Sequence, residues 1–261
     1  MDLKLFNKKA LVTASSQGIG RAIAFALAKE GADVTLSGRN ENTLKDTVGS
    51  LRPHVKGNIA YQVCDVSDAN QIKALIKAAI GDEQQIDILV NNTGGPKTGT
   101  LETLTDQDWL ESFELHLLSY IRLLKGALPY LKKNGGRVLN IASISVKEPI
   151  PNLMLSNTFR PAIAGWTKAT AQELAKDGIL MNTLAPGKIA TDRVMELDKQ
   201  RARAEKMTVE KVKAQAEQDI PLGRYGQPDE FAKYAAFLLS EANTYMTGQT
   251  LLIDGGLTKS I

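Results

Sequence analysis

The chain has 261 residues, of which 43% are hydrophobic and 23% charged, with 21 Gly and 9 Pro. This balance is that of an ordinary globular protein and excludes a disordered one. The 32 basic and 29 acidic residues are spread along the chain and give a formal charge of +3. No concentrated basic field for nucleic acid or for a membrane surface is therefore expected.

A single cysteine, Cys64, excludes an internal disulfide and is typical of a reducing compartment. Two histidines and one cysteine, far apart in sequence, lack the spacing of metal ligands, so we expect no metal. The N-terminal residues are not apolar enough for a signal peptide, and no later segment approaches the length of a membrane span. A cytoplasmic protein is the expectation.

Short β-branched runs alternate with longer stretches of helical periodicity, which is typical of a parallel sheet with helical crossovers. The expected strands are residues 9–13, 33–37, 58–63, 86–91, 136–142, 179–184 and 250–253. The expected helices include residues 19–30, 69–79, 106–132, 155–177 and 228–240. Right-handed crossovers put helices on both faces, so the sequence predicts a Rossmann-type, doubly wound α/β fold of about seven strands.

No repeat, low-complexity tract or linker divides the chain, and we expect one domain over residues 1–261. Charges crowd residues 192–219, where only thin apolar stripes persist, which predicts a pair of surface helices. This segment is either a solvated face or a mobile, lid-like insertion over a substrate cleft. Both interpretations stay open at this stage.

A glycine-containing turn, TASSQGIG from Thr13 to Gly20, joins the first expected strand to a helix. Gly18 and Gly20 allow the backbone to approach a pyrophosphate, which the exposed amides and the positive end of the helix then stabilise. By itself such a turn indicates no more than a short connection between a strand and a helix.

Further motifs follow in order: Asp65-Val66, the run NNTG from Asn91 to Gly94, Pro186-Gly187 followed by Thr191, and GQTLLIDGG at 248–256. Together with the turn they resemble the signature motifs of the short-chain dehydrogenase/reductase family over nearly the whole chain. The resemblance implies a bound nicotinamide dinucleotide. Its candidate binding residues are Thr13, Ser15, Ser16, Gln17, Gly18, Ile19, Gly20, Arg39, Asp65, Val66, Asn92, Thr93, Gly94, Pro186, Gly187, Ile189 and Thr191.

Two positions bear on how the cofactor binds. Ala14 stands where the family has its first glycine. If the backbone there has a conformation that only glycine adopts freely, a residue with a side chain is strained by about 1–3 kcal/mol. The acid that selects NAD in the family aligns with Gly38, and the next residue, Arg39, offers forked donors to a 2′-phosphate. We predict NADP, although Arg39 as an ordinary surface residue is the alternative.

The family carries out its chemistry with Ser, Tyr, Lys and Asn. Ser143 in NIAS aligns with the family serine, but Ser156 stands at the Tyr position, Arg160 at the Lys position and His116 at the Asn position. Ser156 and Arg160 keep the i, i+4 spacing that places two side chains on one helix face. We take Ser143, Ser156, Arg160 and His116 as the candidate catalytic residues of an altered site.

The altered residues change the proton chemistry. A serine hydroxyl is a poorer acid than a phenol, and arginine stays protonated and relays no proton. His116 titrates near neutrality and is a candidate proton donor, or else a hydrogen-bonded histidine in a helix interface. Four further charged residues are expected near the cleft: Lys97, Lys147, Glu148 and Lys188. Each is either solvated at the surface or, for the lysines, a partner of an anionic substrate group. Resemblance to 3-oxoacyl-acyl-carrier-protein reductases indicates phosphopantetheine as such a group.

Three functions remain open. The first is an NADP-dependent oxidoreductase acting on a carbonyl or secondary alcohol, a small-molecule substrate that includes a 3-oxoacyl-carrier-protein-like one. The second is a non-catalytic NADP-binding sensor or scaffold, and the third is halide release, because halohydrin dehalogenases resemble this family and carry Arg at the Lys position. The resemblance also implies a homotetramer built through the helices at 106–132 and 155–177 and the last strand.

Overall fold

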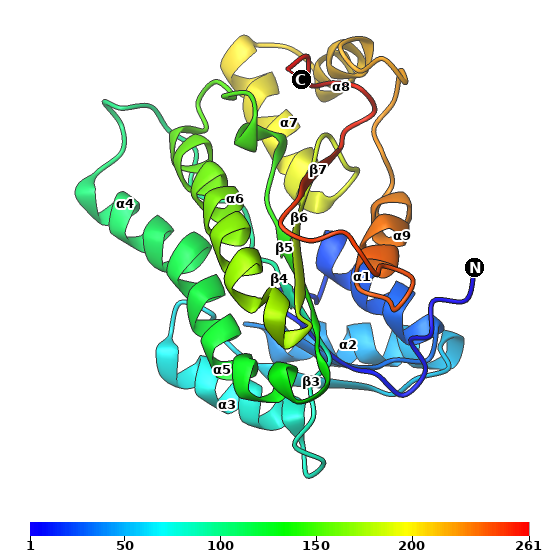
Figure 1. Ribbon diagram of the computed structural model, residues 1–261. Coiled ribbons are helices and arrows are strands. Elements are labelled where there is room, and N and C mark those ends of the chain that lie inside the picture. The colour runs from blue at the N-terminus through cyan, green and yellow to red at the C-terminus, as the bar shows by residue number, and fades with distance from the viewer. Residues whose placement is uncertain (261) are drawn as a thin grey trace.

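The computed structural model describes residues 1–260, and its centre is a sheet of seven parallel strands (Figure 1). The strands are β1 (Lys9–Val12), β2 (Asp33–Gly38), β3 (Ile59–Val63), β4 (Ile88–Asn91), β5 (Arg137–Ile141), β6 (Leu180–Pro186) and β7 (Thr250–Ile253). Their order in the sheet is β3-β2-β1-β4-β5-β6-β7. The predicted doubly wound α/β fold is confirmed.

The helices connect these strands. They are α1 (Gly18–Lys29), α2 (Glu41–Leu51), α3 (Ala69–Ile80), α4 (Asp106–Phe113), α5 (Ser119–Asn134), α6 (Met154–Leu174), α7 (Asp192–Glu205), α8 (Val209–Gln218) and α9 (Pro228–Leu238). Single turns of other helix types are η1 (Arg52–His54), η2 (Glu114–Leu118), η3 (Ile144–Val146) and η4 (Ala175–Asp177). In Figure 1 α3, α5 and α6 lie on one side of the sheet and α1 and α9 on the other.

The alternation of side chains along each strand builds two apolar layers. In β1, Ala10 and Val12 face the layer that contains α1, α2 and α9, whereas Leu11 faces the layer of α3, α5 and α6. Both layers are closed: Leu11, Val12 and Ile23 of α1 are fully buried. The inner strands β1, β4, β5 and β6 are covered on both faces, so their residues read as nearly continuous apolar runs.

The strand order reverses between β1 and β4. The chain runs outward from β1 through β2 to β3 and then crosses back to β4 on the other side of β1. In open α/β sheets, ligands bind outside the carboxyl ends of the strands at this reversal. The turn after β1 and the NNTG run after β4 therefore meet at the same edge.

The helix expected over residues 106–132 is interrupted in the structure. A capping box between Thr105 and Asp108 starts α4, but η2 then forms one π-helical turn in which the Ser119 amide donates to the Glu114 carbonyl, five residues back. The Ser119 hydroxyl also donates to the Leu115 carbonyl at 2.5 Å. The extra residue in this turn shifts the faces of α4 and α5 relative to one another, and His116 lies within it.

Residues 192–219 form the expected helix pair, α7 and α8, between β6 and α9. A small apolar cluster of Ala216, Ile220 and Tyr225 packs beneath them. Within residues 1–260 no helix has the length and hydropathy to cross a membrane. The same residues contain no group of three or more His, Cys, Asp or Glu side chains arranged to hold a metal ion.

Candidate functional site

A cleft of about 890 Å³ opens at the carboxyl ends of the strands, and most of the candidate residues line it. Its size is within the range of ligand pockets. The lining includes Ser16, Gln17, Gly18, Ile19, Arg39, Asp65, Val66, Asn92, Thr93, Gly94, Ser143, Ser156, Arg160, Pro186, Gly187, Ile189 and Thr191. Thr13, Ser15, Gly20 and His116 are not part of this lining.

The turn after β1 is held against the end of β4 by buried hydrogen bonds. The Thr13 hydroxyl donates to the Asn92 carbonyl at 2.7 Å, and the Asn92 amide nitrogen donates back to that hydroxyl at 2.8 Å. The Asn92 side chain donates to the Ala14 carbonyl at 3.1 Å. Thr13 and Ser15 are fully buried, and the Ser15 hydroxyl accepts the Ser37 amide of β2. Both residues shape the turn from behind.

Gly20 is required by close packing. A Cβ at this position would lie 2.4 Å from the Ala14 carbonyl oxygen and 2.8 Å from the Asn92 side-chain nitrogen. The absence of a side chain lets α1 start directly beneath the turn, so that its first amides and its positive end face the cleft. Such an arrangement favours a phosphate group at this position.

Ala14 has a backbone φ of 44°, a conformation that favours glycine. The substitution noted in the sequence therefore falls on a position with left-handed backbone. Ala14 also lines the cleft, so its methyl group narrows the space beside the turn.

One end of the cleft lies over β2 and β3. Arg39 follows β2 directly and is exposed, and within residues 1–260 its guanidinium has no hydrogen-bond or ion-pair partner. Asp65 follows β3, where its carboxylate accepts bonds from the Ser67 amide at 3.0 Å and hydroxyl at 2.7 Å. Arg39 is thus free to pair with a phosphate at this end.

The other end lies between β5 and β6. The Gly187 amide donates to the Ile253 carbonyl of β7 at 3.0 Å, and the Thr191 hydroxyl accepts the Val194 amide at the start of α7. Thr191 faces the glycine turn, because a Cβ on Gly18 would lie 3.6 Å from its methyl carbon. The loop after β6 and the turn after β1 therefore approach each other across the cleft.

Three serines lie near the end of β5: Ser143 and Ser145 follow the strand, and Ser156 lies in the first turn of α6. The Ser143 hydroxyl accepts the Ser145 amide at 3.2 Å, and the Ser145 and Ser156 hydroxyls are 3.0 Å apart. Ser145 and Ser156 are buried, and Ser143 and Ser156 both line the cleft. The hydroxyls of Ser143 and Ser156 are thus presented to a ligand from adjacent elements.

Arg160 lies one helical turn beyond Ser156 on α6 and is only 5% exposed. Its guanidinium donates to the Ile141 carbonyl at 2.9 Å. The Tyr120 hydroxyl of α5 donates to the same carbonyl, also at 2.9 Å. Arg160 is therefore anchored at the end of β5, two residues before Ser143.

His116 is 1% exposed, and its Nδ1 is 3.0 Å from the Thr93 hydroxyl. Burial, together with the nearby charges of Arg160 and Arg193, lowers its pKa to about 2. The imidazole is therefore neutral at physiological pH and holds no acidic imidazolium proton. This geometry favours the hydrogen-bonded interface histidine over the proton donor.

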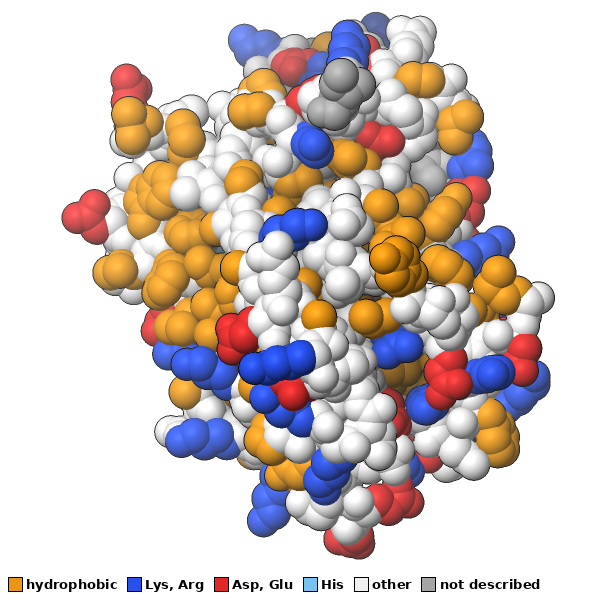
Figure 2. All heavy atoms as spheres, in the orientation of Figure 1, with side chains coloured by type: hydrophobic (Ala, Val, Ile, Leu, Met, Phe, Trp, Pro, Cys, Tyr) orange, Lys and Arg blue, Asp and Glu red, His pale blue; other side chains and the backbone are white. Residues whose placement is uncertain are grey.

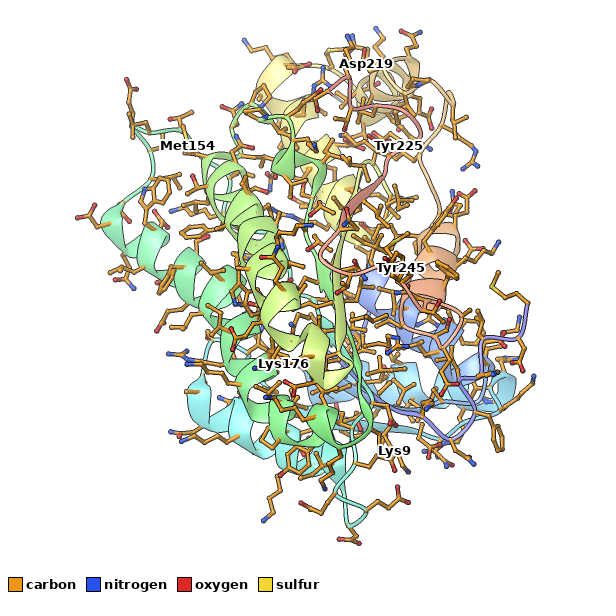
Figure 3. The ribbon with its side chains drawn as sticks, in the orientation of Figure 1. Lys9, Met154, Lys176, Asp219, Tyr225 and Tyr245 are labelled. Atoms are coloured by element: carbon orange, nitrogen blue, oxygen red, sulfur yellow. The ribbon has the colours of Figure 1, made fainter. Side chains whose placement is uncertain are left out.

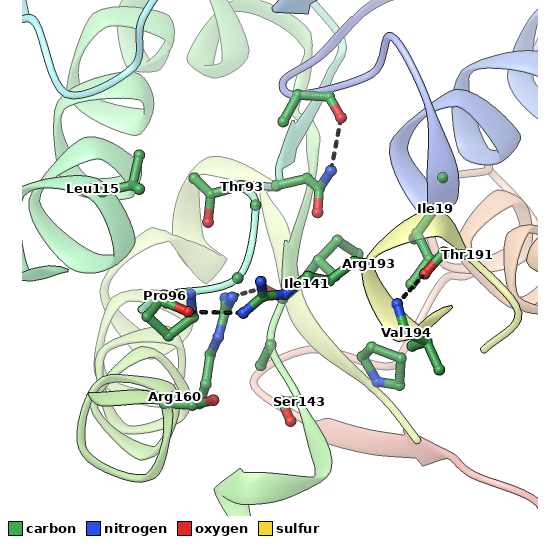
Figure 4. A pocket seen from close by; sticks show the side chains of 18 of the residues that line it. Ile19, Thr93, Pro96, Leu115, Ile141, Ser143, Arg160, Thr191, Arg193 and Val194 are labelled. Atoms are coloured by element: carbon green, nitrogen blue, oxygen red, sulfur yellow. Dashed lines mark hydrogen bonds between the residues drawn. The ribbon is translucent and has the colours of Figure 1, made fainter. Parts of the chain in front are cut away.

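Arg193, the second residue of α7, is a site residue that sequence reasoning missed. Its guanidinium donates to the Pro96 carbonyl at 2.8 Å, and Figure 4 shows it entering the same cleft as Arg160. In the sequence it is one of many charges in residues 192–219, so no local signal distinguishes it. Ser145 was missed too, although it lies two residues after Ser143.

Lys188, considered above for binding an anionic group, lines the cleft but is already paired. Its ammonium is 3.2 Å from the carboxylate of Asp198, whose other oxygen accepts the Tyr225 hydroxyl at 2.8 Å. Burial and the adjacent Asp198 carboxylate raise the pKa of Tyr225, which lies below α8 (Figure 3). Lys97 lies outside the lining and pairs with Asp108 at 2.8 Å.

The sequence matches a family model described as enoyl-(acyl carrier protein) reductase over residues 13–258. It is 34% identical over 259 residues to the 3-oxoacyl-[acyl-carrier-protein] reductase FabG of Chlamydia pneumoniae, covering 99% of this chain and 100% of the relative.

Two solved structures share the fold. L-sorbose reductase from Gluconobacter frateurii, complexed with NADPH and L-sorbose, superposes with a TM-score of 0.95 at 30% identity, covering 100% of both chains. YwfH, an NADPH-dependent reductase involved in bacilysin biosynthesis, superposes with a TM-score of 0.93 at 31% identity, covering 98% of this chain and 100% of that one. These matches extend over almost every element described above, and the chain belongs to the short-chain dehydrogenase/reductase family.

Proposed function

We propose that the protein is an NADP-dependent reductase of carbonyl compounds. The observation that carries this proposal is that Ser143, Ser156 and Arg160 line the same cleft as the turn at the start of α1. One end of the cleft has the features of a dinucleotide site, and the other presents hydroxyl donors and a fixed positive charge. The NADPH-dependent relatives support the direction of the reaction.

The residues present fit NADP(H). The amides at the start of α1 would hold the pyrophosphate, Asp65 and Val66 the adenine, and the segment from Pro186 to Thr191 the nicotinamide side. Arg39 has free donors for the 2′-phosphate, and the end of β2 carries Gly38 where the acid that selects NAD would stand. When bound, the reduced cofactor supplies a hydride to the carbonyl carbon of the substrate.

The protein's own groups act on the carbonyl oxygen. The Ser143 hydroxyl donates a hydrogen bond that polarises the carbonyl, and the positive charge of Arg160 stabilises the negative charge that develops on its oxygen. The Ser156 hydroxyl gives its proton to that oxygen and regains one through Ser145, 3.0 Å away. Solvent supplies the net proton, and the product is an alcohol.

The test is consumption of NADPH by the purified protein with a panel of aldehydes and ketones that includes a 3-oxoacyl thioester. We expect turnover, and we expect Ser143→Ala to lower kcat about 100-fold or more because one donor to the oxyanion is lost. Ser50→Ala, an exposed serine of α2, is the matched control and should leave kcat unchanged. Tight NADPH binding without turnover of any carbonyl would refute the reductase proposal.

That result would support the second candidate, an NADP-binding sensor. The observation in its favour is that the lining lacks the proton-donating pair of the family: within residues 1–260 it contains no tyrosine, and its one lysine, Lys188, is held by Asp198. Halide release has no comparable structural support.

We also infer one domain in which α7 and α8 serve as a lid, a homotetramer as the assembly, and a cytoplasmic location. The lid proposal rests on Thr191, Arg193 and Val194, which line the cleft at the start of α7. The assembly proposal rests on exposed apolar side chains of α4, where Leu110 is 61% and Phe113 39% exposed. Figure 2 shows hydrophobic side chains gathered over this side of the molecule.

A further inference from the structure

Arg160 and Arg193 bring two positive charges into the cleft without carboxylate partners. Each makes one hydrogen bond to a backbone carbonyl, Arg160 to Ile141 and Arg193 to Pro96. Within residues 1–260 neither guanidinium forms an ion pair. Since a guanidinium carries five N–H donors, most of the donors on both side chains are left without a partner.

Arg160 is buried and Arg193 is half-buried. Because unpaired charge removed from water is costly, this pair favours binding of an anion. Burial lowers the pKa of Arg193. The charges of Arg160 and Arg193 both lower the pKa of His116, so both guanidinium groups lie near this histidine. Four acidic side chains also line the cleft: Asp65, Glu111, Glu114 and Asp192. None of them is within hydrogen-bonding distance of either arginine; Glu111 accepts from Gln107 at 3.0 Å instead.

The path of Arg193 across the cleft is provided by the loop after β4. A Cβ on Gly95 would lie 2.8 Å from the Arg193 Nε, so the arginine lies directly on a residue without a side chain. From there it reaches the Pro96 carbonyl, on the far side of the cleft from α7. The guanidinium is thus the contact by which the proposed lid touches the sheet side of the site.

We infer that Arg160 and Arg193 form an anion-binding subsite, which selects carbonyl substrates that also bear a carboxylate or phosphate group. The forked donors of arginine match both anions. This inference rests on the proposed reductase function and names its substrate class. The anion bridges α6 and α7, so binding of the correct substrate also holds α7 over the cleft.

The position of Arg160 restricts the substrate further. Its guanidinium is bonded to the carbonyl of Ile141, and the Cα atoms of Ile141 and Ser143 lie at most roughly 7 Å apart along the chain. The proposed reduction also uses the charge of Arg160 at the carbonyl oxygen, so Arg160 can serve the carbonyl and the anion only in a substrate that carries these two groups close together. This geometry describes 2-oxo and 3-oxo acids.

The experiment compares isosteric charged and neutral compounds. Turnover is measured with NADPH and either benzoylformate or its amide, benzoylformamide. Binding is measured by calorimetry on the protein–NADPH complex with oxamate, oxamide and inorganic phosphate, none of which is reduced. Each measurement is made on the wild type, on Arg193→Gln and on Arg201→Gln. Arg201 is a half-exposed arginine on the same helix that pairs with Glu205 and bonds Gln215, and its variant controls for loss of charge.

We expect kcat/KM for benzoylformate to exceed that for the amide at least tenfold, mainly through KM. Arg193→Gln should reduce this preference to less than threefold and lower the affinity for oxamate at least tenfold. Arg201→Gln should leave the preference and the affinity unchanged. Displacement of oxamate by phosphate at similar concentration identifies phosphate as an accepted anion. Failure of phosphate to displace it restricts the subsite to carboxylates.

The subsite and the reductase proposal fail in different ways. Turnover of neutral carbonyls with no preference for the acid, and oxamate binding no tighter than oxamide, would overturn the subsite alone. Oxamate binding that depends on Arg193, in a protein that reduces no carbonyl, would support the subsite and overturn the reductase.

Discussion

Ala14 is a non-glycine residue with a φ of 44° at the head of the cofactor turn. Such a conformation costs about 1–3 kcal/mol, and a glycine would remove this strain at an entropic cost of about 0.4–1 kcal/mol in the unfolded chain. We therefore expect Ala14→Gly to raise the free energy of unfolding by about 1 kcal/mol, measured by urea denaturation.

Ala26→Gly is the control, because Ala26 lies inside α1 with ordinary helical geometry. It should lower the free energy of unfolding by about 1 kcal/mol. Equal destabilisation by both glycines would show that the turn holds no strain at Ala14.

His116 makes the stability of the protein depend on pH. Its folded pKa of about 2 lies below the unfolded value of 6.5, so below pH 6.5 the unfolded chain binds a proton that the folded chain excludes. Stability from this source is present above pH 6.5 and is lost as the pH falls. The advantage of the wild type over His116→Asn in unfolding free energy should shrink by about 1.4 kcal/mol between pH 7.5 and 5.5.

Denaturant titrations at several pH values measure this difference. His54→Asn, at an exposed position, should show the pH dependence of the wild type. If the difference between the wild type and His116→Asn stays constant over this range, His116 does not hold the low pKa.

The sequence predicted which segments meet at the cleft, because motifs that follow parallel strands gather at one edge of the sheet. It did not separate residues that line the cleft from those behind it: Thr13, Ser15 and Gly20 are directed into packing. It gave no indication of Arg193, whose position depends on the docking of α7 across Gly95. Contacts between distant segments of this kind leave no local pattern.

At the scale of elements, all seven expected strands are present, most with ends shifted by one or two residues, because buried parallel strands are readable as short apolar runs. The interruption of the helix at 106–132 was not predicted. One inserted residue in η2 changes the hydrogen bonding but barely disturbs the apolar periodicity. Helix α2, which the sequence analysis did not name, begins at its cap, Asn40.

The helix pair α7–α8 is fastened by one buried carboxylate. Asp198 is 3% exposed and binds both Lys188 and Tyr225. We expect Asp198→Asn to weaken this attachment by about 1–2 kcal/mol, since the ion pair is lost while the amide still accepts the Tyr225 hydrogen bond. Hydrogen exchange followed by mass spectrometry should show faster exchange in α7 and α8 than in β1 to β5.

The control is Glu205→Gln, which removes an exposed i, i+4 ion pair with Arg201 on the same helix. Its effect should stay below about 0.5 kcal/mol. If hydrogen exchange in Asp198→Asn were faster by the same factor in the sheet and in α7 and α8, the two helices would not open separately from the core.

At the scale of the whole molecule, we predict a homotetramer that uses the α4 surface. Leu110 and Phe113 are exposed there, next to a contact between the rings of Trp109 and Phe159. Leu110→Asp should give a smaller species in light scattering with unchanged circular dichroism, because a charge is costly in an interface but not on a free surface.

Tyr234→Asp on α9 is the matched control, since Tyr234 is 54% exposed on the opposite helical layer. It should leave the mass unchanged. A wild-type protein that is monomeric by light scattering would contradict the assembly.

The Ile141 carbonyl has both of its lone pairs occupied, one by the phenol of Tyr120 and one by the guanidinium of Arg160. Tyr120 is the second residue after the π-helical turn, which ends at Leu118, so the phase of the helix beyond that turn sets where the phenol points. A substitution that restored regular α-helical winding at Glu114–Leu118 would rotate Tyr120 away and free one lone pair. The reactive end of the cleft is therefore linked to a helix irregularity through a backbone carbonyl that both Tyr120 and Arg160 share.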